Sequence, residues 1–164
     1  MTQQSMILVR EPHADEHTWI ERQLCDWWGA TMVVGRGRQH DASRLPALVA
    51  VQDDELVGLA TFNFEDVECE LVTLNSLRDG HGVGSALLAQ VAEGAAERGC
   101  RRLWLITSND NMRAIRFYQR RGMRLVAIYR DAVDEARRIK PSIPLVGDHG
   151  IPVHDELEFE LLLD

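Results

Sequence analysis

Short apolar runs alternate with polar turns in the first half of the chain. The runs at 47–51 and 56–64 are rich in β-branched residues, and the polar tetrapeptide between them predicts a hairpin of two antiparallel strands. In the segment 15–28 the apolar residues follow a helical spacing, which predicts a helix capped by Asp15. The stretch 29–44 is polar and has no clear period, so we expect a loop there. The strands expected in this half are 6–10, 31–34, 47–51, 56–64 and 67–76.

Strands and helices alternate in the second half. The pattern predicts a helix that ends at Gly99, a buried strand, and a second helix that ends at Gly122. Antiparallel hairpins followed by a strand–helix–strand–helix–strand half predict a mixed α/β sheet. No repeat or linker interrupts the pattern, so we expect one domain over 1–164. The elements expected in this half are a helix at 83–98, a strand at 102–107, a helix from 111 to 121, a strand at 123–129, a helix at 131–139, an irregular loop at 140–152 and a strand at 156–163.

Composition narrows the classes of function. The chain has 164 residues, of which 45% are hydrophobic, so it is long enough to bury a core of its own. It contains no stretch as long as a membrane span and no signal-peptide pattern, so we expect a cytoplasmic protein with no membrane partner. Three widely spaced cysteines predict neither a disulfide framework nor a metal site. The formal charge of −8 argues against nucleic acid as a partner and favours cationic small molecules such as amines.

The most informative segment is Asp79-Gly80-His81-Gly82-Val83-Gly84, which we call the glycine turn (residues 79–84). It joins a predicted strand to a predicted helix, and its three glycines leave the backbone bare where the helix begins. Free N–H groups at that position favour a phosphate or pyrophosphate. A P-loop would need a lysine after Gly84, and a dinucleotide fingerprint would need another glycine spacing. The remaining alternative is an ordinary turn whose glycines only permit positive φ.

Two segments resemble the GNAT (Gcn5-related N-acetyltransferase) superfamily. The glycine turn is similar to the family's acetyl-CoA motif, Q/R-x-x-G-x-G/A, and residues 111–123 are similar to its N-x-x-A-x-x-F-Y-x-x-x-G-F segment, with Met123 in place of the last aromatic residue. The chain departs from the first motif at Asp79, where the family has Gln or Arg, and Arg78 is the adjacent residue that could supply the charge. The resemblance implies a mostly antiparallel central sheet with one splayed parallel strand pair, flanked by helices.

The same resemblance implies acetyl-CoA as a co-substrate. Its pantetheine arm would pair with the backbone of 71–75, and 102–107 would form the far side of the gap; the alternative is an ordinary paired core strand. Asn111 caps its helix on either interpretation, and Ser85 either binds a phosphate or only belongs to the first helical turn. The cofactor-binding residues implied by the resemblance are Leu74, Asn75, His81, Gly82, Val83, Gly84, Ser85 and Asn111.

Two residues are expected to carry the chemistry. The family places a tyrosine at the position of Tyr118 near the cofactor sulfur, where it can protonate the leaving thiolate; the alternative is that Tyr118 only fills the core. The attacking amine must lose a proton, and Glu70 is our first candidate for the base. A charged residue on a strand most often faces water, so each candidate base has a structural alternative. The further candidates for the base are Glu68, Asp155, Glu156 and Glu158.

The acceptor site of this fold is usually built by the region that contains Trp27-Trp28 and the loop 35–38. We expect the tryptophans to belong to the helix core and the arginines of the loop to be solvated; the alternative is that both contact the acceptor. The loop 140–152 either shapes the acceptor pocket or forms a homodimer contact. The polar cluster 154–156 also could line this pocket, and it lacks metal-ligand spacing.

The function predicted from the sequence is an acetyl-CoA-dependent N-acetyltransferase. It would move the acetyl group to a primary amine of a small molecule, or of a peptide, by direct attack in a ternary complex. No cysteine nucleophile is expected, because Cys69 and Cys100 have no histidine partner nearby in the sequence. The alternative from another class is an acyl-CoA-binding sensor without turnover. A nucleotide-binding regulatory domain fits less well, because the P-loop lysine is absent.

Overall fold

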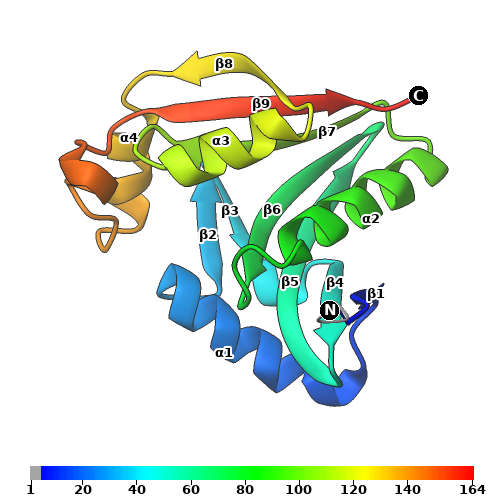
Figure 1. The fold of residues 1–164 in the computed structure, drawn as a ribbon. Coiled ribbons are helices and arrows are strands. Elements are labelled where there is room, and N and C mark those ends of the chain that lie inside the picture. Colours follow the sequence, from blue (N-terminus) through cyan, green and yellow to red (C-terminus); the bar gives the residue numbers. More distant parts are fainter. Residues whose placement is uncertain (1–4) are drawn as a thin grey trace.

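A seven-stranded mixed sheet runs through the protein, whose computed structural model describes residues 5–164 (Figure 1). The strand order is β1-β4-β5-β6-β7-β9-β8, and every neighbouring pair is antiparallel except β6 and β7. The mixed α/β sheet with one parallel pair confirms the predicted fold class. The strands of this sheet are β1 (Leu8–Arg10), β4 (Ala47–Gln52), β5 (Glu55–Glu65), β6 (Glu68–Ser76), β7 (Arg102–Ser108), β8 (Arg124–Tyr129) and β9 (Glu156–Leu162).

Four helices and a separate hairpin cover the sheet. The hairpin pairs β2 (Met32–Gly35) with β3 (Arg38–Asp41), and it shares no strand pairing with the main sheet within residues 5–164. Three short 3₁₀ turns complete the fold at 14–16, 42–44 and 148–150. The helices are α1 (His17–Trp28), α2 (Val83–Glu97), α3 (Met112–Arg120) and α4 (Ala132–Ile139).

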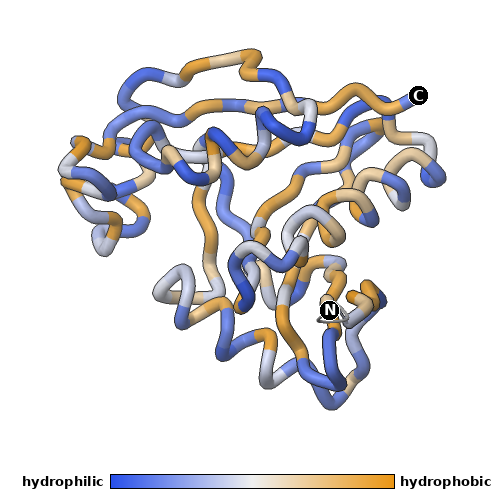
Figure 2. The backbone as a smooth tube through the Cα atoms, viewed as in Figure 1, coloured by the Kyte–Doolittle hydropathy of each residue, from blue (hydrophilic) through white to orange (hydrophobic). Residues whose placement is uncertain are grey.

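The core is divided by the two faces of the sheet. On one face, α2 and α3 bury the larger cluster, which includes Leu87, Tyr118 and Phe159. On the other face, α1 packs its buried Ile20 and Leu24 on the sheet, as the helical spacing of its apolar residues predicted. Figure 2 shows hydrophobic residues along β5 and β7, whereas β9 alternates and the segment that joins β6 to α2 is mostly hydrophilic. No helix of the described chain is long and apolar enough to cross a membrane.

The parallel strands β6 and β7 separate soon after they begin. They pair only between 68–70 and 102–104. Beyond that point β6 stays with β5 up to Ser76, and β7 stays with β9 up to Ser108. Each strand therefore follows a different neighbour, and the backbone edges that face each other at 71–76 and 105–108 are left without a strand partner. This separation is the splay that the resemblance implied.

Local expectations had mixed outcomes. Asn111 caps α3 as predicted, because its side chain accepts a hydrogen bond from the Ala114 amide at 3.1 Å. The predicted cap Asp15 is wrong: residues 14–16 form a 3₁₀ turn, and Glu16 occupies the N-cap position of α1 without a side-chain cap. The stretch 29–44 is a hairpin rather than a loop with one short strand. The loop 140–152 is irregular, as expected.

Candidate active site

A cavity of about 320 Å³ opens where β6 and β7 separate, and we call it the cleft cavity. Its walls come from the end of α1, the β2–β3 hairpin, both separating strands, α4 with the loop that follows it, and the start of β9. Segments from Trp27 to Glu156 therefore meet around this cavity. Among the residues predicted from the sequence, Glu70, Asn111 and Glu156 line it.

The glycine turn joins the separated end of β6 to α2 (Figure 1). Gly80 and Gly82 adopt φ angles of 74° and 83°, in the left-handed region that favours glycine. Gly82 is the N-cap residue of α2, and no side chain caps this helix. The first-turn N–H groups are thus left without a side-chain acceptor, which is the condition for anion binding by the main chain. His81 is exposed, whereas the side chain of Val83 is buried.

Gly84 and Ser85 bring α2 into contact with α3. A Cβ atom at Gly84 would lie 3.1 Å from Cζ of Phe117, so the glycine allows the two helices to approach closely. The hydroxyl of Ser85 accepts a hydrogen bond from Nε of Arg121 at 2.7 Å. The guanidinium of Arg121 also lies over the Phe117 ring, 3.6 Å from its centroid. The guanidinium of Arg121 is therefore held beside the positive end of the α2 dipole. A bound anion would relieve the repulsion between these two positive groups.

Asp79 is neutralised by a residue that the sequence did not point to. Its carboxylate forms an ion pair with Arg113 of α3, and both side chains are exposed. Arg78 does not supply the charge missing at position 79, because its guanidinium binds Asp53 and Glu55 at the β4–β5 turn, at 3.0 and 2.9 Å. The suggestion that Arg78 compensates for Asp79 is therefore wrong.

The free edge of β6 carries the residues predicted to contact the pantetheine arm. Leu74 and Asn75 remain paired with β5 on one side, and their other side faces the gap. The side chain of Asn75 accepts a hydrogen bond from Nε1 of Trp28 at 2.9 Å. The end of α1 is thereby fastened to β6, and the tryptophan is a wall of the cleft cavity as well as a part of the helix.

Tyr118 lies on the inner face of α3, in the larger core cluster, with 9% of its surface exposed. Its ring packs edge-on against Phe117, with centroids 5.2 Å apart, and tilted against Phe159, at 6.3 Å. Burial raises the pKa of its hydroxyl above the usual value for tyrosine. Tyr118 therefore fills part of the core, and its hydroxyl stays protonated at neutral pH.

Glu70 lies at the last position where β6 and β7 pair, and it is 6% exposed. One carboxylate oxygen lies 3.2 Å from Nε2 of His40, on strand β3. Burial raises the pKa of Glu70, and the charges of His40 and Arg38 partly oppose this shift. The predicted base is thus a buried carboxylate on the wall of the cleft cavity, held by the strand that the sequence analysis did not find.

Glu156 is the second carboxylate that is buried on the wall of this cavity, with 3% of its surface exposed. One of its oxygens accepts a hydrogen bond from the Arg36 amide at 2.8 Å, and burial raises its pKa.

The other candidate bases form ion pairs with basic residues. Glu68 and Glu158 form ion pairs with Arg102 at 3.0 and 3.1 Å. Asp155 forms an ion pair with His154 at 2.8 Å, and neither residue lines the cavity.

The tip of the β2–β3 hairpin is fixed to the main sheet by Arg36. Its guanidinium pairs with Glu158 at 3.0 Å and lies 5.1 Å from the ring centroids of both Trp104 and Tyr129. Arg38 pairs with Glu65. Arg36 is exposed, in line with the expectation that these arginines are solvated, but its guanidinium also has carboxylate and aromatic partners on the sheet.

Comparisons with known proteins agree with this geometry. The model of the acetyltransferase (GNAT) family matches residues 6–123. The protein YdhI of Bacillus subtilis is 36% identical over 160 residues, which cover 97% of this chain and 99% of YdhI. The chain belongs to the GNAT acetyltransferase family.

Solved GNAT structures share the fold. A GNAT family acetyltransferase from Elizabethkingia anophelis with acetyl-CoA bound superposes with a TM-score of 0.68 at 16% identity, covering 96% of this chain and 98% of that one. A Bacillus subtilis acetyltransferase in complex with CoA gives a TM-score of 0.68 at 20% identity, covering 98% and 99%. The GNAT family match ends at residue 123, so α4, the loop after it and β9 lie beyond the matched segment.

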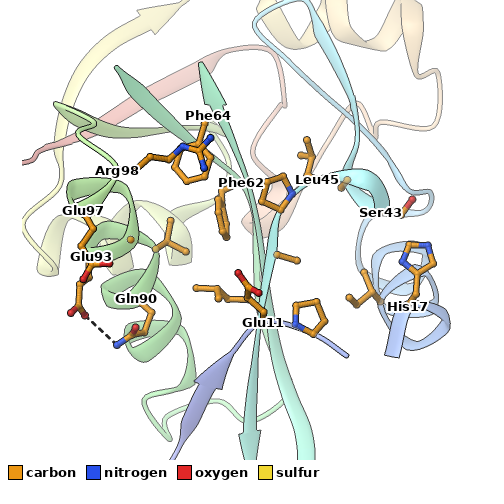
Figure 3. A pocket seen from close by; sticks show the side chains of 18 residues that line it. Glu11, His17, Ser43, Leu45, Phe62, Phe64, Gln90, Glu93, Glu97 and Arg98 are labelled. Carbon is orange, nitrogen blue, oxygen red and sulfur yellow. Dashed lines mark hydrogen bonds between the residues drawn. The ribbon is translucent and has the colours of Figure 1, made fainter. Parts of the chain in front are cut away.

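A second cavity of about 830 Å³ lies outside the GNAT cleft, between α1 and α2 (Figure 3). Phe62 and Phe64 contribute apolar surface, and Glu93 and Glu97 of α2 stand beside it. The guanidinium of Arg98 covers the Phe64 ring at 4.2 Å. None of the residues predicted to bind the cofactor or to act in catalysis lines this cavity. Its larger volume therefore does not make it the active site.

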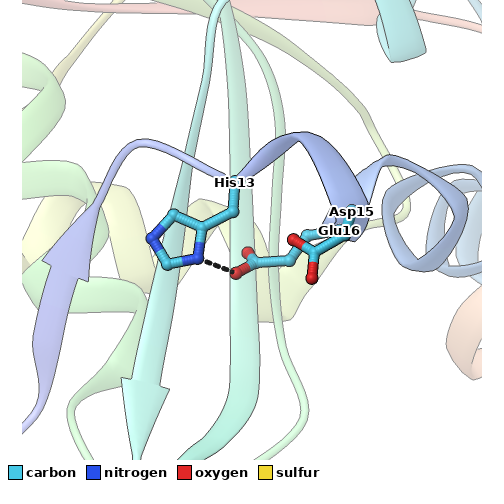
Figure 4. A group of neighbouring side chains, drawn as sticks. All are labelled: His13, Asp15 and Glu16. Carbon is cyan, nitrogen blue, oxygen red and sulfur yellow. Dashed lines mark ion pairs between the residues drawn. The ribbon is translucent and has the colours of Figure 1, made fainter.

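Within residues 5–164, two groups of side chains have the spacing of metal ligands. One consists of His13, Asp15 and Glu16 (Figure 4), and the other consists of Asp131, His154 and Asp155. Glu16 is already engaged, because its carboxylate pairs with Arg10 at 2.7 Å and with His13 at 3.1 Å. Asp155 is engaged in the same way by His154 and by the Asp131 amide. Ion pairing and capping explain both groups without a metal.

Four residues at the cleft cavity or beside the glycine turn were not predicted from the sequence as site residues. His40 and Lys140 line the cleft cavity, and Arg113 and Arg121 stand beside the glycine turn. Arg113 lies in the first turn of α3 and Arg121 is its C-cap residue, so the spacing of eight residues leaves them about 80° apart around the helix axis and was no clear signal. Lys140 is the only lysine of the chain. For His40 the sequence carried no signal, because β3 is polar throughout.

Proposed function

We propose that this protein transfers the acetyl group of acetyl-CoA to a primary amine of a small molecule, by direct attack of the amine in a ternary complex. The observation that carries the proposal is the separation of β6 from β7 beside Glu70, a buried carboxylate, with the free edge of β6 leading to the glycine turn. The acetyl-CoA and CoA in two structures of similar fold support the choice of co-substrate. A peptide amine is the alternative acceptor.

The residues around the cleft fit such a co-substrate. The uncapped first turn of α2, together with Ser85 and Arg121, would hold the phosphates. The free backbone at 71–75 would pair with the pantetheine arm, and Asn111 reaches the same cavity from the N-terminus of α3. When bound, acetyl-CoA supplies the activated acetyl group. Main-chain donors carry most of this binding, which explains how Asp79 is tolerated in the motif.

Glu70 is the base in this proposal. Its carboxylate is buried, so its pKa is raised and its affinity for a proton is higher than that of an exposed glutamate. His40 holds one of its oxygens, which leaves the other for the attacking nitrogen. Glu70 takes a proton from the acceptor amine and thereby makes the nitrogen lone pair available for attack.

Tyr118 is the acid. Burial keeps its hydroxyl protonated at neutral pH, so it can donate that proton to the departing sulfur. A cysteine nucleophile is disfavoured, because burial raises the pKa of the Cys69 thiol to about 12 and also raises that of Cys100. Both groups remain thiols at neutral pH. This supports direct transfer without an acetylated enzyme.

The test is to incubate the protein with acetyl-CoA and a panel of amines and to follow the release of free thiol. Amine-dependent release is expected. Binding of CoA without amine-dependent release would instead support the acyl-CoA sensor. Failure to bind CoA at all would contradict both functions.

The Tyr118→Phe variant tests the proposed acid. We expect kcat to fall by tenfold or more, with little change in the Kd of acetyl-CoA, because only the proton donor is removed. Tyr129→Phe is the control for the loss of a tyrosine hydroxyl, because the Tyr129 hydroxyl bonds to Glu158, which has no part in the proposed chemistry. An unchanged kcat of Tyr118→Phe, under conditions where the chemical step limits the rate, would remove Tyr118 from the mechanism.

A further inference from the structure

Three carboxylates on the wall of the cleft cavity are at least nine-tenths buried, and they are not equivalent. Asp110, Glu70 and Glu156 are 8%, 6% and 3% exposed. Both oxygens of Asp110 are used by the protein, one by the Ser108 hydroxyl at 2.5 Å and one by the Asp148 amide at 3.2 Å. Asp110 therefore holds the loop after α4 in place, and this role accounts for its burial.

Glu70 and Glu156 each use only one oxygen. Glu70 binds His40, and Glu156 binds the Arg36 amide, through one oxygen each. Within residues 5–164, every side-chain nitrogen or oxygen that is fully enclosed has a hydrogen-bond partner. The second oxygen of each glutamate is therefore not sealed in the protein but reaches the cavity that both residues line.

The two free oxygens belong to different parts of the cavity. Glu70 is on β6 and Glu156 is on β9, and β7 lies between these strands. Neighbouring strands are about 4.8 Å apart, so the two backbones are separated by about 10 Å across the sheet. Along β7, Glu70 is level with Trp104, whereas Glu156 is level with Ser108. One small ammonium group does not satisfy both carboxylates.

Within residues 5–164, no cation near the cavity forms an ion pair with Glu156. The guanidinium of Arg36 is bound to Glu158, so its charge acts on Glu156 without direct contact, and only its amide forms a hydrogen bond to Glu156. The ammonium of Lys140 donates to the carbonyl oxygens of Trp28 and Met32, at 2.8 and 3.1 Å. Met32 begins β2 and Arg36 follows its end, so about 13 Å of extended chain separates Lys140 from Glu156.

We propose that the acceptor is a diamine, whose reacting nitrogen lies at Glu70 and whose second ammonium group binds the free oxygen of Glu156. This inference rests on the proposed function for the role of Glu70. The segment between the two nitrogens is uncharged, because apolar side chains such as Val34, Val133 and Pro144 line the same cavity. Glu156 selects the substrate in this arrangement, and Glu70 removes the proton.

A matched series of six-carbon amines tests the proposal on the unmodified protein. We expect kcat/KM to be about tenfold to a hundredfold higher for 1,6-diaminohexane than for hexylamine, because the diamine adds a hydrogen-bonded ion pair with a buried carboxylate. We expect 6-aminohexanoate to be the poorest acceptor, because its carboxylate would meet Glu156. Equal kcat/KM values for hexylamine and 1,6-diaminohexane would overturn the proposal.

Glu156→Gln should reduce the preference for the diamine to about threefold or less, mainly through a higher KM. Glu135→Gln, on the exposed side of α4, is the control and should keep the full preference. Binding of CoA and the circular dichroism spectrum show whether each variant is folded. Survival of the full preference in a folded Glu156→Gln variant would overturn the role of Glu156.

Calorimetric titration of 1,6-diaminohexane into the CoA-loaded protein separates this inference from the proposed function. Binding that depends on Glu156, without acetylation of any amine, would support the diamine site and contradict the transferase. Acetylation of hexylamine and 1,6-diaminohexane with equal efficiency would support the transferase and contradict the diamine site.

Discussion

The glycine turn follows one of the two separating strands and the cleft cavity is lined by both, but the two regions are built in different ways. The turn is one continuous segment of six residues, its donors are main-chain groups, and the charges beside it, Asp79 and Arg113, are exposed. The cavity is assembled from side chains of many segments, and its two free carboxylates are buried. Substitutions of single side chains should therefore have small effects at the turn and large effects in the cavity.

The largest expected effect is that of Glu70→Gln in the cavity. The amide cannot accept the proton of the amine, so we expect kcat to fall by about a hundredfold or more, while the Kd of acetyl-CoA stays within about twofold. Steady-state kinetics and a CoA titration measure the two quantities. Glu68→Gln is the matched control, because Glu68 is on the same strand and pairs with Arg102. If both variants lose activity equally, Glu70 is not the base.

The next effect concerns the packing beneath the glycine turn. A Cβ atom at Gly58 of β5 would lie 2.5 Å from Cγ1 of Val83 and 3.2 Å from the carbonyl oxygen of Asn75. Gly58→Ala should push the start of α2 away from the sheet, lower the free energy of unfolding by about 1–3 kcal/mol and raise the KM of acetyl-CoA. Urea unfolding and kinetics provide the measurements.

Gly94→Ala is the control for that substitution. Gly94 lies inside α2 with open space around its Cα, so alanine should stabilise the helix by up to about 1 kcal/mol and leave the KM unchanged. If Gly58→Ala left both the stability and the KM unchanged, the turn would not depend on the packing below it. The main-chain site would then be independent of the sheet.

The same contrast explains which features the sequence predicted. The glycine turn and the Asn111 cap are local, so their residue types define their geometry, and the predicted strands and helices that flank them were found. The hairpin was missed because β3 reads Arg-Gln-His-Asp, without any apolar position. Its conformation depends on its pairing with β2 and on contacts such as that between His40 and Glu70.

The composition of the cavity was predictable only in part. Glu70 and Glu156 were both candidates, because a carboxylate on a strand is visible in the sequence. Their burial, and the engagement of Glu68 and Glu158 by Arg102, depend on which strands become neighbours. The pairing of Asp79 with Arg113 joins residues 34 positions apart, and no local pattern encodes it.

A smaller effect is expected at the turn from Asp79→Gln, which introduces a residue that the GNAT motif usually has. The change removes a carboxylate beside the positive end of α2 and frees Arg113. We expect the KM of acetyl-CoA to fall by about twofold to fivefold, the size of a charge effect at an exposed helix terminus. Glu97→Gln, at the other end of α2, should leave the KM unchanged. A higher KM for Asp79→Gln would show instead that Asp79 positions Arg113 for the cofactor.

The smallest effect is that of Glu156→Gln on folding stability. This substitution should impair the recognition of the diamine but stabilise the fold. Burial raises the pKa of Glu156 above its ordinary value of 4.5. At a pH between these two pKa values, Glu156 is protonated in the folded protein and ionised in the unfolded chain. Stability therefore falls as the pH rises through this window, and the full cost is present above it. Glu156→Gln removes that cost and keeps an acceptor for the Arg36 amide.

We therefore expect Glu156→Gln to raise Tm by about 2 °C at a pH above this window, and to have the same Tm as the parent protein below pH 4.5. Thermal unfolding at both pH values measures the difference, with Glu135→Gln as the exposed control. A lower Tm at the higher pH would mean that a protein group already compensates the charge of Glu156. The free oxygen of Glu156 would then be unavailable to a ligand. Glu70 alone would remain as evidence that the acceptor site is built from side chains whereas the cofactor site is built from main-chain groups.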